Sequence, residues 1–190
     1  MRLKLHLALA TFIVLAMASV GISQESVHQH QHHDDQGAKK DEKSKTSHSH
    51  SDHLDGVNSR GDRAMGFSHT RVTHHFRLTR DGGTIEVTAN DPKDTESIDL
   101  IKKHFEQISK SFAEGDFNKS VMTHGKTPPG VPTMARLKSE IDYKYEGLER
   151  GGRIRLTTKN TEALAAIHEF LRFQIKDHQT GDSLEVEPEK

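Results

Sequence analysis

GGTIEVTAND at residues 82–91 and GGRIRLTTKN at residues 151–160 are two versions of one pattern. Both begin with a pair of glycines, and both then place an aliphatic residue at alternate positions. Such alternation is typical of a strand with one buried face, and a glycine pair marks the turn before it. Each stretch therefore predicts the second strand of a β-hairpin.

The residues before each glycine pair alternate in the same way. Apolar positions from Val72 to Leu78 predict the first strand of one hairpin. Those from Ile141 to Tyr145 predict the first strand of the other. The sequence thus predicts four strands arranged as two hairpins.

A helix is predicted after the first hairpin. Asp91 suits the N-cap and Pro92 the first helical position. Apolar residues follow at helical spacing from Ile98 to Phe112, and Gly115 is a stop signal. This segment is expected to be amphipathic.

The second hairpin is followed by a similar segment. Asn160 or Thr161 is expected to cap a second helix, which Gly181 ends. Between the two units, residues 116–132 are rich in proline and are expected to form a stiff loop.

These elements predict an α+β fold with the order β-β-α-β-β-α. We expect a two-layer sandwich in which a four-stranded antiparallel sheet carries two helices on one face. The matching hairpin–helix units suggest pseudo-twofold symmetry. The folded domain is expected at residues 65–182, followed by a frayed acidic tail at residues 183–190.

The composition limits how much of the chain can join this core. Hydrophobic residues make up 32% of the 190 residues, below the roughly 45–50% of a typical soluble domain. Cysteine is absent, which excludes disulfides, thiolate metal sites and cysteine nucleophiles. The formal net charge is −1, so no strong global charge attracts nucleic acid or anionic lipid.

Residues 1–23 have the layout of a secretory signal peptide. Arg2 and Lys4 form a positive start, an apolar run follows, and Ala18 and Ser23 suit alternative cleavage sites. A transmembrane anchor, the alternative, needs about 20 apolar residues, more than this run contains. We expect a periplasmic or secreted protein with no stable membrane anchor after cleavage.

Residues 24–64 are expected to form a disordered arm, because few of them are apolar. Two clusters of histidines with neighbouring aspartates stand out. Neutral imidazole suits copper, zinc and nickel, and a flexible arm can wrap one ion with several rings. The arm therefore predicts capture of a divalent transition metal, and the alternative is a solubilising or pH-responsive spacer. The clustered histidines are His28, His30, His32, His33, His48, His50 and His53.

Four further histidines fall on or beside apolar faces of the predicted elements: His74, His104, His168 and His178. One hypothesis is a metal site built from some of them, with Asp177 as a ligand or an orienting partner. The alternative is a set of separate, hydrogen-bonded histidines. His168 and His178 lie about 15 Å apart along a helix, so both can bind one ion only if the helix ends early.

No catalytic or cofactor-binding motif is present. The glycine pairs do not fit a phosphate loop, and no serine has a nucleophile-elbow context. The arginines expected on the outer sheet face lack the stacking aromatics of a nucleic-acid site; they are Arg71, Arg77, Arg153 and Arg155.

The leading functional hypothesis is an exported metal-capture protein that uses the arm and, in addition, a histidine site in the domain. One alternative is an extracytoplasmic module that binds a protein or peptide partner, with the arm as a spacer. Another is a small hydrolase or transferase that uses His168, His178 or Asp177.

MGFSHTRVTHHF at residues 65–76 and HEFLRFQIKDHQTGD at residues 168–182 resemble a family of small exported bacterial proteins. DGGTIEV, AEGDF, PPGVP and ERGGRIRLTTKN also match, so the resemblance covers nearly the whole predicted domain. Some members carry the label aspartate carbamoyltransferase. The S-T-R-T-type loop and the H-P-x-Q segment of that enzyme do not occur in this chain. The resemblance therefore implies export and carries over no active-site residue.

Overall fold

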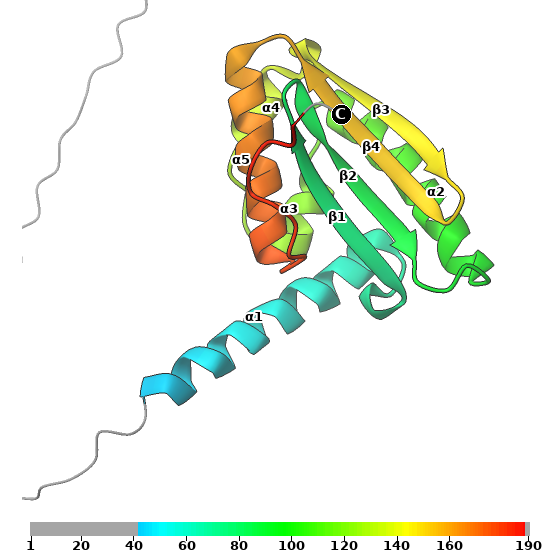
Figure 1. Cartoon of the computed structure of the whole chain (residues 1–190), viewed down its shortest axis with the longest axis vertical. Helices are drawn as coiled ribbons and strands as arrows, with labels where there is room; N and C mark the ends of the chain where they lie inside the picture. The colour runs from blue at the N-terminus through cyan, green and yellow to red at the C-terminus, as the bar shows by residue number, and fades with distance from the viewer. Residues whose placement is uncertain (1–41, 189–190) are drawn as a thin grey trace, which may run out of the picture. The chain divides into compact units, whose positions relative to one another are not determined.

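The computed structural model describes residues 42–188, with side chains from residue 51 onward (Figure 1). The predicted signal peptide at residues 1–23 and the first part of the predicted arm, residues 24–41, lie outside the described residues. Within residues 42–188, no helix combines the length and the apolar character needed to cross a membrane.

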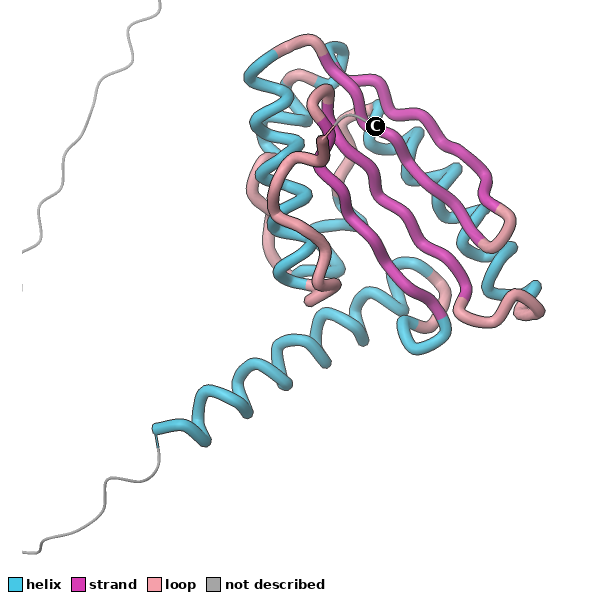
Figure 2. Tube along the Cα trace, viewed as in Figure 1, coloured by secondary structure: helices cyan, strands magenta, loops and turns pink. Residues whose placement is uncertain are grey.

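The predicted four-stranded antiparallel sheet is confirmed. Its strands are β1 (Val72–Thr79), β2 (Gly82–Ala89), β3 (Ile141–Leu148) and β4 (Gly151–Thr158). They lie in the order β1-β2-β4-β3, so the two hairpins are joined through β2 and β4 (Figure 2). The glycine pairs, expected as turns, belong to the strands themselves.

The register of the central strand pair is symmetric between the two units. Gly82 lies opposite Thr157, and Gly151 lies opposite Thr88. These pairs occupy equivalent positions of the two repeated sequences, so exchanging the units reproduces the pairing. The pseudo-twofold relation suggested by the sequence is therefore present in the sheet.

Two long helices, α2 (Thr95–Ala113) and α5 (Thr161–Asp177), cover one face of the sheet (Figure 1). α2 follows β2 but packs mainly on β3 and β4, whereas α5 follows β4 but packs mainly on β1 and β2. Each helix thus covers the hairpin of the other unit. One hydrophobic core fills the space between the layers; its fully buried residues include Leu78, Ile101, Ile154, Leu156 and Ile167.

The second glycine of each pair lets a helix approach the sheet closely. A Cβ atom at Gly83 would lie 2.2 Å from Cδ1 of Leu171 on α5 and 2.4 Å from the carbonyl oxygen of Arg77. A Cβ atom at Gly152 would lie 3.1 Å from Cβ of Phe105 on α2. The two glycines therefore have equivalent places under opposite helices.

The start of the first helix differs from the prediction. α2 begins at Thr95, and its N-cap is Asp94, whose carboxylate accepts a backbone hydrogen bond from the first turn. Asp91 instead accepts a hydrogen bond from the amide of Lys93, within a turn that precedes the helix. The second helix is capped by Asn160, as expected.

The proline-rich connection contains helices that the sequence reading missed. α3 (Asn118–His124) lies within residues 116–132, and α4 (Val131–Arg136) starts at their end. Gly125 ends α3 with a left-handed φ of 67°. Two short 3₁₀ helices, η1 (His69–Arg71) and η2 (Lys138–Glu140), precede β1 and β3.

The expected disorder of residues 24–64 does not hold from residue 51 onward, because residues 42–65 form α1 (Glu42–Met65). The C-terminal part of α1 packs on α3. Arg60 there donates a hydrogen bond from Nε to the carbonyl oxygen of Thr123 at 3.0 Å.

Helical spacing of a few residues explains this docking. Val57 is fully buried, and Leu54 and Gly61 lie about one turn to either side of it. The three positions therefore share one face of α1. Although few residues of this segment are apolar, those few lie in a narrow stripe along one face of α1.

The expected fraying of residues 183–190 also fails over its described part, up to residue 188. Val186 pairs in parallel with Leu78 of β1, and the amide of Glu187 donates to the carbonyl oxygen of Leu78 at 2.9 Å. Leu184 packs against the core as well. The tail follows the outer edge of β1, where its few apolar residues pack against the core.

Candidate functional site: a histidine-lined pocket

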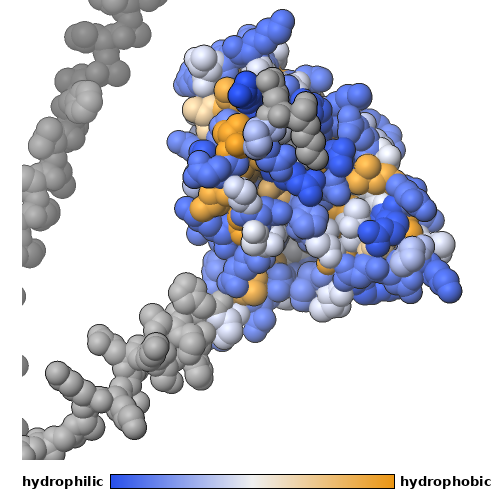
Figure 3. Space-filling model, viewed as in Figure 1, coloured by the Kyte–Doolittle hydropathy of each residue, from blue (hydrophilic) through white to orange (hydrophobic). Residues whose placement is uncertain are grey.

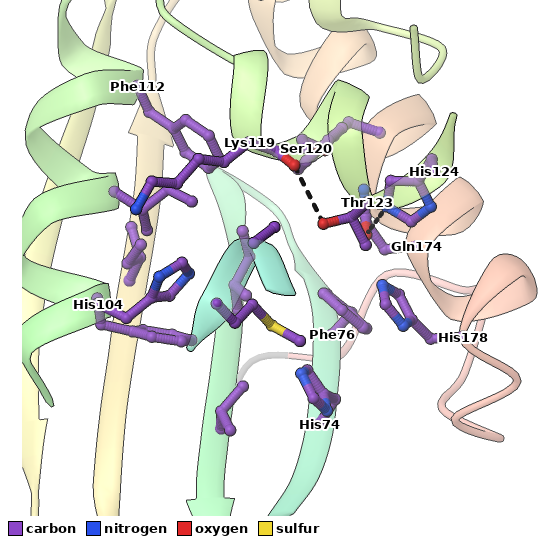
Figure 4. Close-up of a pocket in the computed structure, with 18 residues that line it drawn as sticks. His74, Phe76, His104, Phe112, Lys119, Ser120, Thr123, His124, Gln174 and His178 are labelled. Atoms are coloured by element: carbon purple, nitrogen blue, oxygen red, sulfur yellow. Dashed lines mark hydrogen bonds between the residues drawn. The ribbon is translucent and has the colours of Figure 1, made fainter. Parts of the chain in front are cut away.

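A small pocket lies between the helices and the sheet (Figure 4). Its volume is about 70 Å³, room for about two water molecules at roughly 30 Å³ each. Side chains from β1, β2, β4, α2 and α5 form mostly apolar walls. Met65 at the end of α1, Ile108 on α2 and Ser120 on α3 are half-buried members of its lining.

Four histidines from four separate parts of the chain line this pocket: His74 on β1, His104 on α2, His124 at the end of α3, and His178, the C-cap of α5. Figure 4 shows His74, His124 and His178 toward one end of the pocket and His104 toward the other. The fold therefore brings together residues that are distant in sequence.

The rings of His74 and His178 stack in parallel. Their centroids are 5.4 Å apart and their planes differ by 8°. The ring of Phe76 stacks on His178, and that of His124 meets His178 edge-on. Burial, followed by the neighbouring histidines, lowers the pKa of His178 to about 3 and that of His74 to about 4. Both rings are therefore neutral at pH 7.

Asp177 anchors the same end of the pocket. Its Oδ2 accepts a hydrogen bond from Nδ1 of buried His124 at 2.6 Å, and its Oδ1 accepts one from Nε2 of His53 on α1 at 2.9 Å. Burial opposes ionisation of Asp177, but the hydrogen bonds from His124 and His53 outweigh it and lower its pKa. Asp177 thus orients His124, a histidine that the predicted metal site did not include.

The second ring nitrogen of His124 faces the amide of Gln174. Nε2 of His124 lies 2.9 Å from Oε1 of Gln174. Burial lowers the pKa of His124 more than Asp177 raises it. A neutral ring with its proton on Nδ1 accepts at Nε2, which requires the Gln174 amide to turn its NH₂ group toward it. In either orientation one polar atom of this buried amide lacks a hydrogen-bond partner among the described residues.

His74 also has a buried polar atom without a hydrogen-bond partner among the described residues. Its ring is half-buried, but Nε2 is fully enclosed and bonds to none of the described residues. A buried polar group without a partner costs about 1–3 kcal/mol. Two such groups therefore lie among the residues that line one small pocket.

Lys119 and His104 lie together at the other end. The ring of His104 is buried against the edge of Phe67, with centroids 5.7 Å apart. Burial, and then the charge of Lys119, lowers the pKa of His104 to about 4. Lys119 is half-buried on α3 and extends toward His104 in Figure 4. This end thus pairs a neutral imidazole with an ammonium group.

His168, the fourth predicted core histidine, lies away from the pocket. Its Nε2 is 2.9 Å from the carbonyl oxygen of Thr79 and 3.0 Å from that of Gly82. Carbonyl oxygens only accept, so Nε2 carries the proton. His168 therefore ties α5 to the β1–β2 turn, which matches the alternative of a separately hydrogen-bonded histidine.

The arrangement of the described residues does not favour a metal site in the domain. No group of three or more histidine, aspartate or glutamate side chains among them is placed to hold an ion. An ion bound by imidazole lies in the plane of the ring, so the parallel rings of His74 and His178 cannot share one as they stand. Both ring nitrogens of His124 already face protein partners.

Most of the histidines in the predicted arm have no described side chain. His28, His30, His32 and His33 lie outside the described residues, as do the side chains of His48 and His50. His53 is described, and it bonds to Asp177.

Sequence reasoning missed His124, Lys119 and Gln174. The first two were assigned to a loop, although Phe117, Val121 and His124 recur at helical spacing and indicate α3. Gln174 carries no such signal, because its role depends on where α3 packs.

Comparison with family models, with curated proteins and with solved structures finds no match to this chain. The family resemblance of residues 65–182 therefore stays a prediction.

In the view of Figure 3, polar and charged residues cover most of the face, with apolar residues only in small patches. The four arginines considered for the outer sheet face each pair with a carboxylate. The pairs are Arg71 with Asp94, Arg77 with Glu86, Arg153 with Glu86, and Arg155 with Asp81.

Both ring nitrogens of His124 are engaged by protein groups. The ring nitrogens of His124 face Asp177 and Gln174, so no described serine or threonine hydroxyl hydrogen-bonds to them as a nucleophile would. The neutral histidines instead supply hydrogen-bonding groups at the ends of an apolar space.

Proposed function

We propose that the protein binds a small, mostly apolar molecule in the histidine-lined pocket. The observation that carries this proposal is the convergence of His74, His104, His124 and His178 on one apolar cavity. An apolar cavity with a few convergent polar groups and shifted pKa values is the usual form of a small-molecule site.

The hydrogen bonding of the pocket supports the same function. A neutral imidazole has one donor and one acceptor nitrogen, so it can meet either kind of ligand group. Nε2 of His74 and one amide atom of Gln174 have no partner among the described residues. A ligand group that hydrogen-bonded to these two atoms would recover part of the free energy that their burial costs.

The test is a titration of the full chain with 1-pentanol and with pentanoate. Binding is monitored through the NMR chemical shifts of the backbone amides. We expect at least one of them to shift amides of residues that line the pocket. Ser120→Phe should abolish the shifts, because Ser120 is half-buried in the pocket lining and a phenyl ring there would occupy the small space. Met122→Phe is the matched control, since Met122 is on the same helix and 63% exposed. Failure of both compounds to bind, or binding unaffected by Ser120→Phe, contradicts the proposal.

A second function, metal capture by the histidine-rich segment after export, is favoured by the sequence. Seven histidines, four of them within His28–His33, lie between residues 28 and 53, next to several aspartates. Such tracts are a compositional sign of metal binding. Copper, zinc and nickel are the ions that imidazole ligands suit.

Metal capture can be tested without touching the pocket. Glutamine at His28, His30, His32 and His33 together should weaken Cu(II) binding by the full chain in calorimetric titration. Glutamine at the four lysines between the clusters is the matched control, because ammonium groups bind no metal; they are Lys39, Lys40, Lys43 and Lys45. Equal Cu(II) affinity in both variants would rule out capture by this cluster.

A further inference from the structure

Lys119 is the feature of the pocket that the proposed function leaves unexplained. It lies on α3 among the lining residues and is half-buried. Among residues 51–188, no carboxylate forms an ion pair with it, whereas Lys110 on α2 pairs with Glu106. An ammonium group thus borders an apolar cavity without a counter-ion from the described residues.

The surroundings of Lys119 favour an anion over a cation or a neutral group. His104 stands next to it, its ring nitrogens hydrogen-bond no described residue, and its pKa is lowered to about 4 by burial and then by Lys119. A neutral imidazole can donate one hydrogen bond and adds no positive charge. The carboxylate of Asp177 is at the other end, where His124 and His53 already bond both of its oxygens.

We propose that the ligand is a small amphipathic monoanion, an unbranched alkyl carboxylate. Its carboxylate lies between Lys119 and His104, and its alkyl chain enters the apolar cavity. This inference rests on the proposed function and specifies the ligand class of the same site. A volume of about 70 Å³ is about half of the 150 Å³ cavity known to admit benzene. A space of this size suits the end of a narrow chain better than an aromatic ring.

The experiment compares three compounds with the same five-carbon chain: pentanoate, 1-pentanol and pentylammonium. Binding to the full chain is measured by NMR shifts at pH 7. A charge-assisted hydrogen bond from Lys119 should make pentanoate bind about tenfold or more tightly than 1-pentanol. Pentylammonium should bind most weakly of the three, because its charge repels that of Lys119.

Two variants separate this inference from the proposed function. Lys119→Gln should remove the preference for pentanoate while 1-pentanol still binds. Lys103→Gln, an exposed lysine beside His104 on α2, should keep the preference. Equal affinities of pentanoate and 1-pentanol for the unaltered protein overturn the anion inference and leave the proposed function standing. Failure of all three compounds to bind overturns both.

Discussion

Nδ1 of His124 lies 2.6 Å from Oδ2 of Asp177, and only 1% and 7% of the two side chains are exposed. The same carboxylate accepts a hydrogen bond from His53 of α1. Asp177 therefore joins three helices, α1, α3 and α5, beside the end of the pocket that His124 and His178 line.

Removal of this carboxylate should destabilise the fold. Asp177→Ala leaves His124 with a buried donor that lacks a partner, and we expect a loss of about 3 kcal/mol in the free energy of unfolding. Asp177→Asn keeps an acceptor for His124 and should cost about 1 kcal/mol. Urea unfolding at pH 7 measures both. Equal losses in the two variants would show that the hydrogen bond to His124 is not what stabilises this region.

The stability of the protein should fall as the pH decreases from about 6.5 to about 4. Burial lowers the pKa of His74, His104 and His178 to between about 3 and about 4. In that range the unfolded chain binds protons at these histidines and the folded chain does not, so acid favours unfolding. Each contributes on the order of 3 kcal/mol. Asp177 and Asp182, whose pKa values are lowered, act only below about 3.8, outside this range.

Urea unfolding at pH 7.5 and pH 4.5 measures this dependence. His178→Phe keeps a ring to stack on Phe76 and removes one of the groups that titrate. The difference in stability between the two pH values should then shrink by about 2–3 kcal/mol. An unchanged difference would mean that His178 is protonated as readily in the folded chain as in the unfolded one.

Gly83→Ala should be strongly destabilising. The new Cβ would meet the carbonyl oxygen of Arg77 at 2.4 Å and Cδ1 of Leu171 at 2.2 Å, and the backbone atom cannot move aside cheaply. We expect a loss of about 2–3 kcal/mol in thermal or urea unfolding. Gly147→Ala is the matched control on β3, because its nearest neighbour would be the Tyr145 hydroxyl at 3.4 Å. A smaller loss at position 83 than at position 147 contradicts the packing described for α5.

The docking of α1 should depend on Val57. Its side chain is fully buried, and Val57→Ala should cost about 1–2 kcal/mol locally. We expect faster amide hydrogen exchange at residues 54–65 while the sheet exchanges as before. Asp55→Ala, an exposed position on the same helix, should leave the exchange unchanged. Fast exchange of residues 54–65 in the unaltered protein would contradict the docking of α1.

The strands could be predicted from the sequence because each obeys a rule of period two. β1 alternates from Val72 to Leu78, and β4 repeats the pattern of β2, so their positions and their partners within each hairpin follow from local patterns. The order of the strands in the sheet does not follow from local patterns. Pairing of Gly82 with Thr157 joins the two units, and no local pattern specifies it.

Only part of the candidate site could be predicted from the sequence. His74, His104 and His178 stood out because histidine is unusual on an apolar face. Their convergence depends on the pairing of β2 with β4 and on the placement of α3, both of which are tertiary. His168 shows the same signal and serves a different purpose, since two carbonyl oxygens of the β1–β2 turn occupy its Nε2. Residue type and face alone therefore do not separate a pocket histidine from a structural one.

The crossed placement of α2 and α5 has a consequence for how this chain can fold. A single hairpin–helix unit would leave the apolar face of its own sheet uncovered, because the helix that covers it belongs to the other unit. One unit alone would need a second copy to bury that face, and its folding would depend on protein concentration. Joining both units in one chain turns that association into an intramolecular step, so this domain can form at any dilution.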